Sequence, residues 1–412
     1  MIEQAVATEE LAIRLLDDYR AGSPFFLSTS RYTLLAEGAI AAVPEESGPG
    51  ALERLPGRVT ALLSAIRPPG YGMPVVVGAI PFDHTAPAQL VVPASLRRAG
   101  PLGTGLADQA GQPPAAAYTV LPVPEPELYE RGVERGLERL RSGELDKIVL
   151  SRSLHLTSPT SVNIGQLLRR LAGNNASGYT FAVHLPDRET EQGQARADRL
   201  NRLAGSRTLI GASPELLVSR VGLQVTANPL AGSAPRSEDP AEDRRRAAAL
   251  LESPKDLHEH AVVVDAVAAA LRPYCRQLDV PAKPSLTRTA AMWHLSSEIR
   301  GELADAATSS LALAIALHPT PAVCGAPTDR AREAIREIEP FDRGYYTGMV
   351  GWCDAAGDGE WIVTIRCAEV ADRSLRLFAG AGVVAESSAA AELAETSAKF
   401  RTMLSAMGFA GE

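Results

Sequence analysis

The segment LDKIVLSRSL, residues 145–154, is interpreted as a β-strand. In an extended chain alternate residues face opposite sides, so Lys147, Val149 and Ser151 share one face. The opposite face carries the aliphatic residues Ile148, Leu150 and Leu154. We therefore predict a strand here in which one lysine stands apart from the aliphatic face.

Strand and helix patterns continue from this segment to the C-terminus. We predict strands over residues 147–156, 179–184, 209–218, 361–370 and 375–378, and helices over residues 256–271 and 390–407. Hairpin-like neighbours outnumber regular βαβ units, which favours a mixed or antiparallel sheet with helices packed on it. The predicted fold class is therefore α/β in the broad sense, of the α+β kind.

The region before this segment has weaker patterns and indicates no chemistry. We predict strands over residues 73–78 and 90–92, helices over residues 9–19, 51–66 and 125–140, and loops over residues 100–117 and 188–207. The second loop is polar and is interpreted as a surface insertion without a catalytic role. Length alone allows either two domains or one large unit.

Composition and charge exclude several classes of function. The chain has 412 residues, of which 45% are hydrophobic and 22% charged, as in globular proteins. A net charge of −8 argues against a nucleic-acid partner, so local positive groups must capture any anionic substrate. No apolar run is long enough for a membrane span, and the acidic N-terminus is not typical of a secretory signal. The four cysteines lack metal-ligand spacing, which disfavours zinc and suits reduced thiols in a cytoplasmic protein.

Lys147 and Glu215 are candidates for a proton-transfer pair. A desolvated lysine has a lowered pKa and can act as a base, although a strand lysine facing solvent is the competing interpretation. Glu215 follows Pro214 and precedes an apolar strand in GASPELLVS. A carboxyl group in apolar surroundings can stay protonated and act as a general acid. The alternative for Glu215 is an exposed carboxylate at a strand edge.

Two predicted helices carry acidic pairs at i,i+3 spacing, Asp256 with Glu259 and Glu392 with Glu395. Each pair lies on one helical face. If the two helices face each other, the four carboxylates form an oxygen-rich site that suits Mg²⁺. In the alternative interpretation Asp256 stabilises the first turn of its helix, and Glu395 forms a surface ion pair with Lys399.

Three further segments suggest anion binding: the turn PLAGS over residues 229–233, the strand arginine Arg366 in WIVTIRCA, and the strand end GAG over residues 380–382. Glycine lets backbone N–H groups approach a carboxylate, and arginine adds a bidentate fork. His294 is either a satisfied buried histidine or a neutral donor to a substrate oxygen. No dinucleotide or P-loop fingerprint accompanies these glycines, so nucleotide binding is not supported.

Ten motifs, taken in order, resemble the chorismate-utilising enzymes, and most closely the isochorismate synthases of catecholate siderophore pathways. They are DKIVLSR, GASPELLV, NPLAGSAPR, KDLHEH, MWHLSSEIRG, ALHPTPAVCG, EIEPFDRGYYTGMVGWCD, GEWIVTIRCA, LFAGAGVVA and ETSAKFRTML. The resemblance covers about residues 120–408, and residues 1–117 are less diagnostic. It implies one large domain over residues 1–412 whose sheets and flanking helices enclose a magnesium site.

The resemblance implies a role for each candidate residue. Lys147 matches the family's general base and Glu215 its general acid. Glu259 and Glu395 match the ligands of Mg²⁺, with Asp256 and Glu392 as outer, water-mediated partners. The groups that match the binding site for the two substrate carboxylates and the ring are Arg366, the backbone at Gly232, Ser233, Gly380 and Gly382, and His294.

The reaction implied by the resemblance is the conversion of chorismate to isochorismate. Lys147 takes a proton from water as it attacks C2 of the ring, the double bond shifts, and Glu215 protonates the departing C4 hydroxyl. A lysine at position 147 favours water over ammonia, so no glutaminase subunit is expected. Ala231 stands where aminodeoxychorismate synthases have a nucleophilic lysine, which argues against that activity.

Two alternatives stay open at the level of sequence. A salicylate synthase forms isochorismate and then eliminates pyruvate, and Ala322, Val323 and Tyr346 lie on pocket positions that separate the two outcomes. Ala322 fits the isochorismate type, whereas Tyr346 replaces a more usual Phe. The other alternative, an inactive chorismate-binding subunit, would not need Lys147 and Glu215. The resemblance also suggests a monomer, and it leaves open whether the product feeds a siderophore, menaquinone or another metabolite.

Overall fold

The main sheet is a continuous antiparallel ladder that runs through two halves of the molecule. The computed structural model describes residues 2–66, 73–103, 106, 118–175, 177–185 and 206–409, and the side chains of residues 2–8 are not described. The first half contains, in spatial order, β5 (Thr119–Val123), β6 (Lys147–Thr157), β20 (Ser374–Val383), β19 (Cys367–Ala371), β8 (Arg207–Ser213), β7 (Tyr179–Leu185), β1 (Phe25–Ser28) and β2 (Thr33–Ala42). The short β16 (Gly325–Ala326) also pairs with β6.

The second half continues from β2 without a break in the pairing. It contains, in order, β4 (Gln89–Ala99), β3 (Val75–Ile80), β17 (Met349–Asp354), β18 (Gly359–Val363), β9 (Leu216–Val221), β10 (Gln224–Asn228), β15 (Ile299–Leu303) and β12 (Cys275–Asp279). A separate sheet has the order β11 (Leu230–Pro235), β14 (Met292–Ser296) and β13 (Ser285–Arg288). The prediction of an antiparallel sheet is therefore confirmed.

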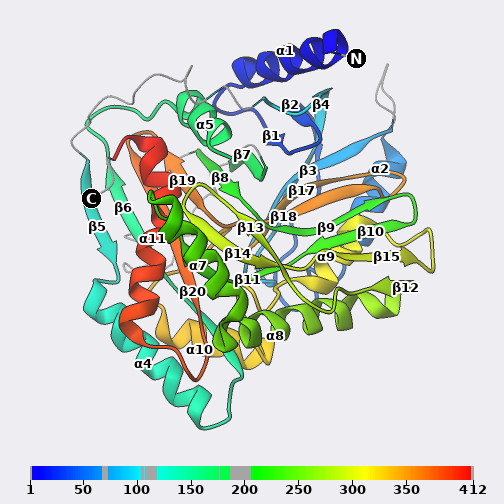
Figure 1. Cartoon of the computed structure of the whole chain (residues 1–412). Coiled ribbons are helices and arrows are strands. Elements are labelled where there is room, and N and C mark those ends of the chain that lie inside the picture. The colour runs from blue at the N-terminus through cyan, green and yellow to red at the C-terminus, as the bar shows by residue number, and fades with distance from the viewer. Residues whose placement is uncertain are drawn as a thin grey trace.

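Helices cover the outer face of each half. The first half packs against α1 (Ile2–Asp18), α5 (Ile164–Gly173) and α11 (Ala389–Met407), and β6 also packs against α4 (Pro126–Arg141) and α10 (Thr328–Ile338). The second half packs against α2 (Leu55–Ala65), α8 (Pro254–Leu271) and α9 (Ser310–Leu317), while α7 (Pro240–Glu252) packs on the smaller sheet. Figure 1 shows α11 lying across β20 and α8 running below the smaller sheet.

The sheet is buried on both faces because its two halves also face each other. In β1, Phe26 points to the helices, whereas its neighbour Phe25 packs inside with residues of the second half such as Val350. In β3, Val76 likewise packs on the outer side of the sheet with the helices, and Val77 packs on the inner side with Phe25. Strands buried on both faces have continuous apolar runs, which explains segments such as FFL and VVVGAI.

Two predicted strands are each divided in the structure. The strand expected over residues 209–218 is β8 and β9, and the strand expected over residues 361–370 is β18 and β19. Pro214 interrupts the first, because proline cannot donate a ladder hydrogen bond. The second is interrupted at Arg366, whose φ of 51° lies in the left-handed region. The prediction that Arg366 lies in a strand is therefore wrong.

The predicted turn, the two predicted loops and the expected lack of a membrane span have different outcomes. PLAGS, predicted as a turn, lies mostly in β11, where the register shifts between Ala231 and Ser233 and Gly232 has a φ of 76°. Most of the predicted loops over residues 100–117 and 188–207 lies outside the described residues. None of the helices in the described part of the chain combines the length and apolar character needed to cross a membrane.

Candidate active site

The candidate site lies where the chain passes twice between the two halves of the sheet. One passage, at Pro214 and Glu215, links β8 to β9, and the other, at residues 364–366, links β18 to β19. The Val363 N–H donates to the Glu215 carbonyl at 3.2 Å, and the Ala212 N–H donates to the Arg366 carbonyl at 3.0 Å. These bonds hold the two passages side by side, which brings together the Glu215 carboxyl group and the Arg366 guanidinium, two groups that are far apart in sequence.

A cavity opens beside these passages and encloses about 530 Å³ of space, counting its open mouth. Most of the predicted site residues line it: Glu215, Gly232, Ser233, Glu259, His294, Ala322, Val323, Tyr346, Arg366, Gly380, Gly382 and Glu395. The remaining three, Lys147, Asp256 and Glu392, lie outside the lining set.

Lys147 is completely buried immediately behind the cavity wall. Its Nζ lies 2.9 Å from Glu259 Oε1, and the Glu259 carboxylate lines the cavity. A Cβ atom placed on Gly382 would lie 3.0 Å from Lys147 Cε. Gly382 lines the cavity, so the aliphatic part of Lys147 lies directly behind this glycine. The alternative of a solvent-facing strand lysine is therefore wrong.

Glu215 is buried at the head of β9, with an exposed fraction of 3%. Burial raises the pKa of its carboxyl to about 7, although the N–H of Leu230 and the charges of Lys147, Arg366 and Lys399 act in the opposite direction. The Leu230 N–H lies 3.4 Å from Glu215 Oε1. Near neutral pH the carboxyl therefore holds its proton for much of the time, and the alternative of an exposed carboxylate is wrong.

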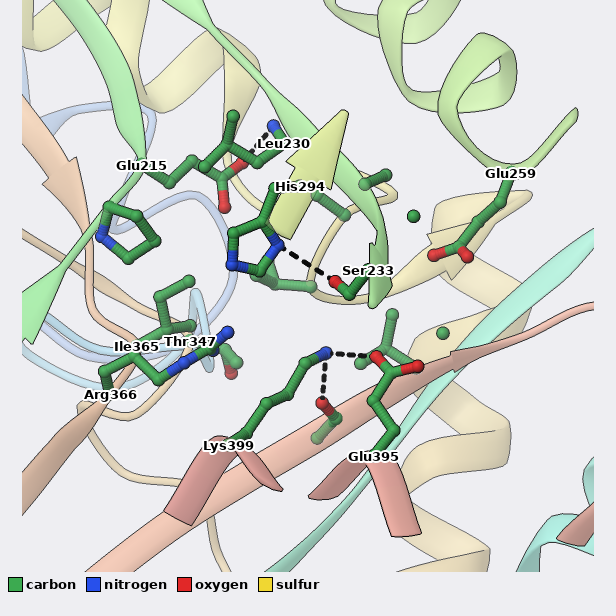
Figure 2. Close-up of a pocket in the computed structure, with 18 of the residues that line it drawn as sticks. Glu215, Leu230, Ser233, Glu259, His294, Thr347, Ile365, Arg366, Glu395 and Lys399 are labelled. Atoms are coloured by element: carbon green, nitrogen blue, oxygen red, sulfur yellow. Dashed lines mark hydrogen bonds and ion pairs between the residues drawn. The ribbon is translucent and has the colours of Figure 1, made fainter. Parts of the chain in front are cut away.

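His294 is a neutral side chain on the cavity wall. Burial, together with the charges of Arg366 and Lys399, lowers the pKa of its imidazole well below the usual value. Its Nδ1 lies 2.9 Å from Ser233 Oγ on the neighbouring strand β11. No described residue forms a hydrogen bond with its Nε2. Figure 2 shows that the ring projects into the cavity, where Nε2 can bond to a bound molecule.

Arg366 supplies positive charge to the cavity, which His294 also lines. The residue is 6% exposed, and its Nε has no hydrogen-bond partner among the described residues. Figure 2 shows its guanidinium directed into the space between His294 and Lys399. A buried guanidinium without a carboxylate partner is costly unless an anion binds there, so this group favours an anionic ligand.

The carboxylates of α8 and α11 face the cavity from two helices. Burial opposes the ionisation of Glu259, but Lys147, Lys399 and Lys255 outweigh it and hold its pKa below the usual value. Glu395 forms an ion pair with Lys399 at 2.5 Å. Both carboxylates line the cavity and offer oxygen ligands.

The two outer acids have different surroundings. Glu392 is fully buried and forms an ion pair of 2.9 Å with Lys255, which joins α11 to the start of α8. Asp256 lies in the first turn of α8, where its N–H donates to Ser253 Oγ at 3.3 Å. Within the described residues, no three His, Cys, Asp or Glu side chains converge closely enough to hold a metal ion by themselves. Mg²⁺ usually takes only one or two protein carboxylates together with water and substrate oxygens, so the pair Glu259 and Glu395 fits it.

Lys399 is a cavity residue to which the sequence prediction assigned no role, and which the alternative interpretation placed in a surface ion pair with Glu395. It is only 11% exposed, and its Nζ donates to the Gly380 carbonyl at 2.9 Å as well as pairing with Glu395. The signal was its position on α11, because residues 392, 395 and 399 form one stripe at helical spacing. The cavity also has apolar wall residues such as Ile365, for which the sequence contains no functional signal.

Comparison with known proteins places these features in a family. Residues 102–408 match the family described as "Chorismate binding enzyme". The chain is 59% identical over 408 residues to isochorismate synthase DhbC of Bacillus subtilis, covering 99% of both chains. It is 39% identical over 411 residues to the vibriobactin-specific isochorismate synthase of Vibrio cholerae, covering 99% of this chain and 97% of that protein. The crystal structure of DhbC from Bacillus anthracis superposes with a TM-score of 0.87 at 54% identity, covering 97% of this chain and all of that one.

Proposed function

The chain belongs to the chorismate-binding enzyme family, and we propose that it is an isochorismate synthase, which adds water at C2 of chorismate with loss of the C4 hydroxyl. The observation that carries this proposal is the cavity itself. It holds a buried acid with a pKa of about 7 and a buried guanidinium, Arg366, whose Nε has no hydrogen-bond partner among the described residues, and a buried lysine lies behind its wall. The relatives described above are isochorismate synthases. Salicylate synthesis is not favoured.

The cavity suits a dianionic substrate. Arg366 provides a buried cation and Lys399 a partly buried one, and the neutral His294 provides a polar ring nitrogen. Gly380 and Gly382 line the wall on β20, where a Cβ atom would collide with Ser151 and Tyr346 at Gly380 and with Glu259 at Gly382. We propose that these groups bind the two carboxylates and orient the ring. Local charge thus compensates for the overall charge of −8.

We propose Lys147 as the general base and Glu215 as the general acid. Glu215 can donate its proton to the departing hydroxyl because burial keeps it partly protonated near neutral pH. Lys147 must be uncharged to accept a proton from water, and its Nζ lies 2.9 Å from Glu259 Oε1, at the edge of the cavity.

We propose Glu259 and Glu395 as the ligands of Mg²⁺, with Asp256 and Glu392 as outer partners through water. Bound there, the ion would neutralise a substrate carboxylate and help to orient the ring. We further propose that the chain acts as a single chorismate-binding domain and a monomer, without a subunit that supplies ammonia. Light scattering of the purified protein tests the monomer.

Product chromatography tests the reaction. The purified protein is incubated with chorismate, with and without Mg²⁺, and the expected product is isochorismate that forms only with the metal. Salicylate and pyruvate as main products would instead support the alternative activity. Unchanged chorismate under all conditions would contradict the proposal.

A further inference from the structure

Arg343 and Glu339 form a buried ion pair that lies outside the cavity lining. Each side chain is 2% exposed, and the pair is bidentate, with Nε–Oε2 and Nη2–Oε1 distances of 2.8 and 2.6 Å. The two residues lie on the connection from α10 to β17. An ion pair this deeply buried is weak evidence of a stabilising role, because desolvation of the charges opposes their attraction.

The remaining hydrogen bonds of Arg343 reach three separate parts of the cavity wall. Its Nη2 donates to the Val149 carbonyl at 2.7 Å, and its Nη1 donates to the Val323 carbonyl at 2.8 Å and to Thr347 Oγ1 at 3.3 Å. All three of these residues line the cavity. They come from β6, from the segment between α9 and β16, and from the segment that leads into β17.

The same pair is connected to the strand of Lys147, the proposed base, and to the passage that carries Arg366, the proposed substrate-binding arginine. Val149 lies two residues after Lys147 on the same face of β6, and the Ser151 N–H also donates to Glu339 Oε1, at 2.8 Å. On the other side, the Thr347 N–H donates to the Thr364 carbonyl at 2.7 Å, in the passage that carries Arg366. The guanidinium thus links the strand of the proposed base to the passage of the substrate-binding arginine.

We propose that Arg343, oriented by Glu339, is a positioning residue that holds these walls in register and thereby sets the place of Lys147 relative to the bound substrate. This inference rests on the proposed isochorismate synthase activity. A planar fork can bond to carbonyls on two segments at once, whereas a lysine ammonium is a single point charge. The arginine is therefore required for its shape as well as its charge.

Arg220 offers a matched control. It is also a buried arginine, 4% exposed, and it donates to the carbonyls of Gly222, Ala356 and Ala306 at 2.9, 2.7 and 2.9 Å. It does not line the cavity, and none of these three partners does. Arg220→Lys therefore removes the same kind of contact without touching the cavity wall.

The first experiment compares Arg343→Lys with Arg220→Lys in kcat, KM and the melting temperature. We expect both variants to melt a few degrees lower than the wild type. We expect kcat to fall by at least about tenfold in Arg343→Lys alone, with a smaller change in KM, because small misplacements of catalytic groups have large effects on rate. An Arg343→Lys variant with the kcat of Arg220→Lys would overturn the inference.

The second experiment separates stability from positioning. Arg343→Met leaves the carboxylate of Glu339 buried without its partner, and we expect a large drop in melting temperature. The double variant Arg343→Met with Glu339→Met removes both charges, so we expect the melting temperature to recover while kcat stays low. Recovery of kcat together with the melting temperature would show a merely structural role.

The outcomes also separate this inference from the proposed function. If the wild type forms no isochorismate, the proposed function fails. If the wild type is active and both the lysine variant and the double methionine variant keep its kcat, only the positioning role fails.

Discussion

At the scale of single residues, Glu215 is the site where function and stability conflict. Its pKa is about 7 in the folded protein, against an ordinary value of 4.5, because burial disfavours the charged carboxylate. Between these two values the unfolded chain loses its proton first, so the folded state becomes less favourable as pH rises. A shift of this size lowers the free energy of unfolding by roughly 3 kcal/mol above pH 7.

Replacing Glu215 with Gln removes this penalty. We expect Glu215→Gln to be inactive, and its stability advantage over the wild type to grow by roughly 2 kcal/mol between pH 5 and pH 8. Urea unfolding at the two pH values measures the change. An advantage that is the same at both pH values would contradict the raised pKa of Glu215.

Lys147 makes a second test at the residue scale. We expect Lys147→Ala to abolish turnover, because no other group in the described part of the site is proposed to take the proton from water. Magnesium-dependent chorismate binding should remain largely intact, since Arg366 and His294 are unchanged. Calorimetric titration with chorismate and Mg²⁺ measures the binding. Unchanged turnover would rule out Lys147 as the base.

At the scale of elements, β20 lies so close to Lys147 and Glu259 that only glycine fits at position 382. A Cβ atom at Gly382 would lie 2.2 Å from Glu259 Oε1. We expect Gly382→Ala to displace Glu259 and to reduce kcat/KM by about tenfold or more. A control is Gly57→Ala in α2, where a Cβ atom meets nothing within 4 Å. That change should leave kcat/KM unaltered and stabilise the protein by about 0.5–1 kcal/mol.

The helix α11 presents one stripe to the cavity and another to solvent. We expect Lys399→Met to raise KM for chorismate at least several-fold, because it removes one of the cations that line the cavity. Arg401→Met changes an exposed cation of the same helix and should leave KM unchanged. Steady-state kinetics measures both variants. Equal KM values in the two variants would show that Lys399 does not contact the substrate.

At the scale of the whole molecule, the site joins the two halves of the sheet, so a bound ligand should stabilise both. We expect chorismate with Mg²⁺ to raise the melting temperature of Glu215→Gln, which binds the substrate without consuming it. A free chorismate concentration of 100 times Kd raises the free energy of unfolding by about 2.7 kcal/mol. A chelator should remove most of this effect, and Glu395→Gln should reduce it. A chorismate effect that is the same with and without chelator would contradict the role of the metal.

The sequence by itself determined the types of element and the residues of the site. The local patterns in residues 147–156 and 73–78 predicted strands, because side-chain direction in a strand depends only on local geometry. The ordered motifs identified many of the residues that line the cavity, since each motif is local in the chain, but they did not identify Lys399 or Ile365. Two strands were predicted as continuous because neither the break at Pro214 nor the left-handed backbone at Arg366 alters the apolar pattern around it.

Only the tertiary structure decided the surroundings of the charges. The burial of Lys147 against Glu259, the raised pKa of Glu215 and the inward position of Lys399 depend on segments that are distant in sequence. Lys399 shows the difference best, because its i,i+4 spacing from Glu395 is the same on a solvated helix face and on a cavity wall. Desolvation and electrostatic interaction act through space, so the fold decides the charge and the role of each residue.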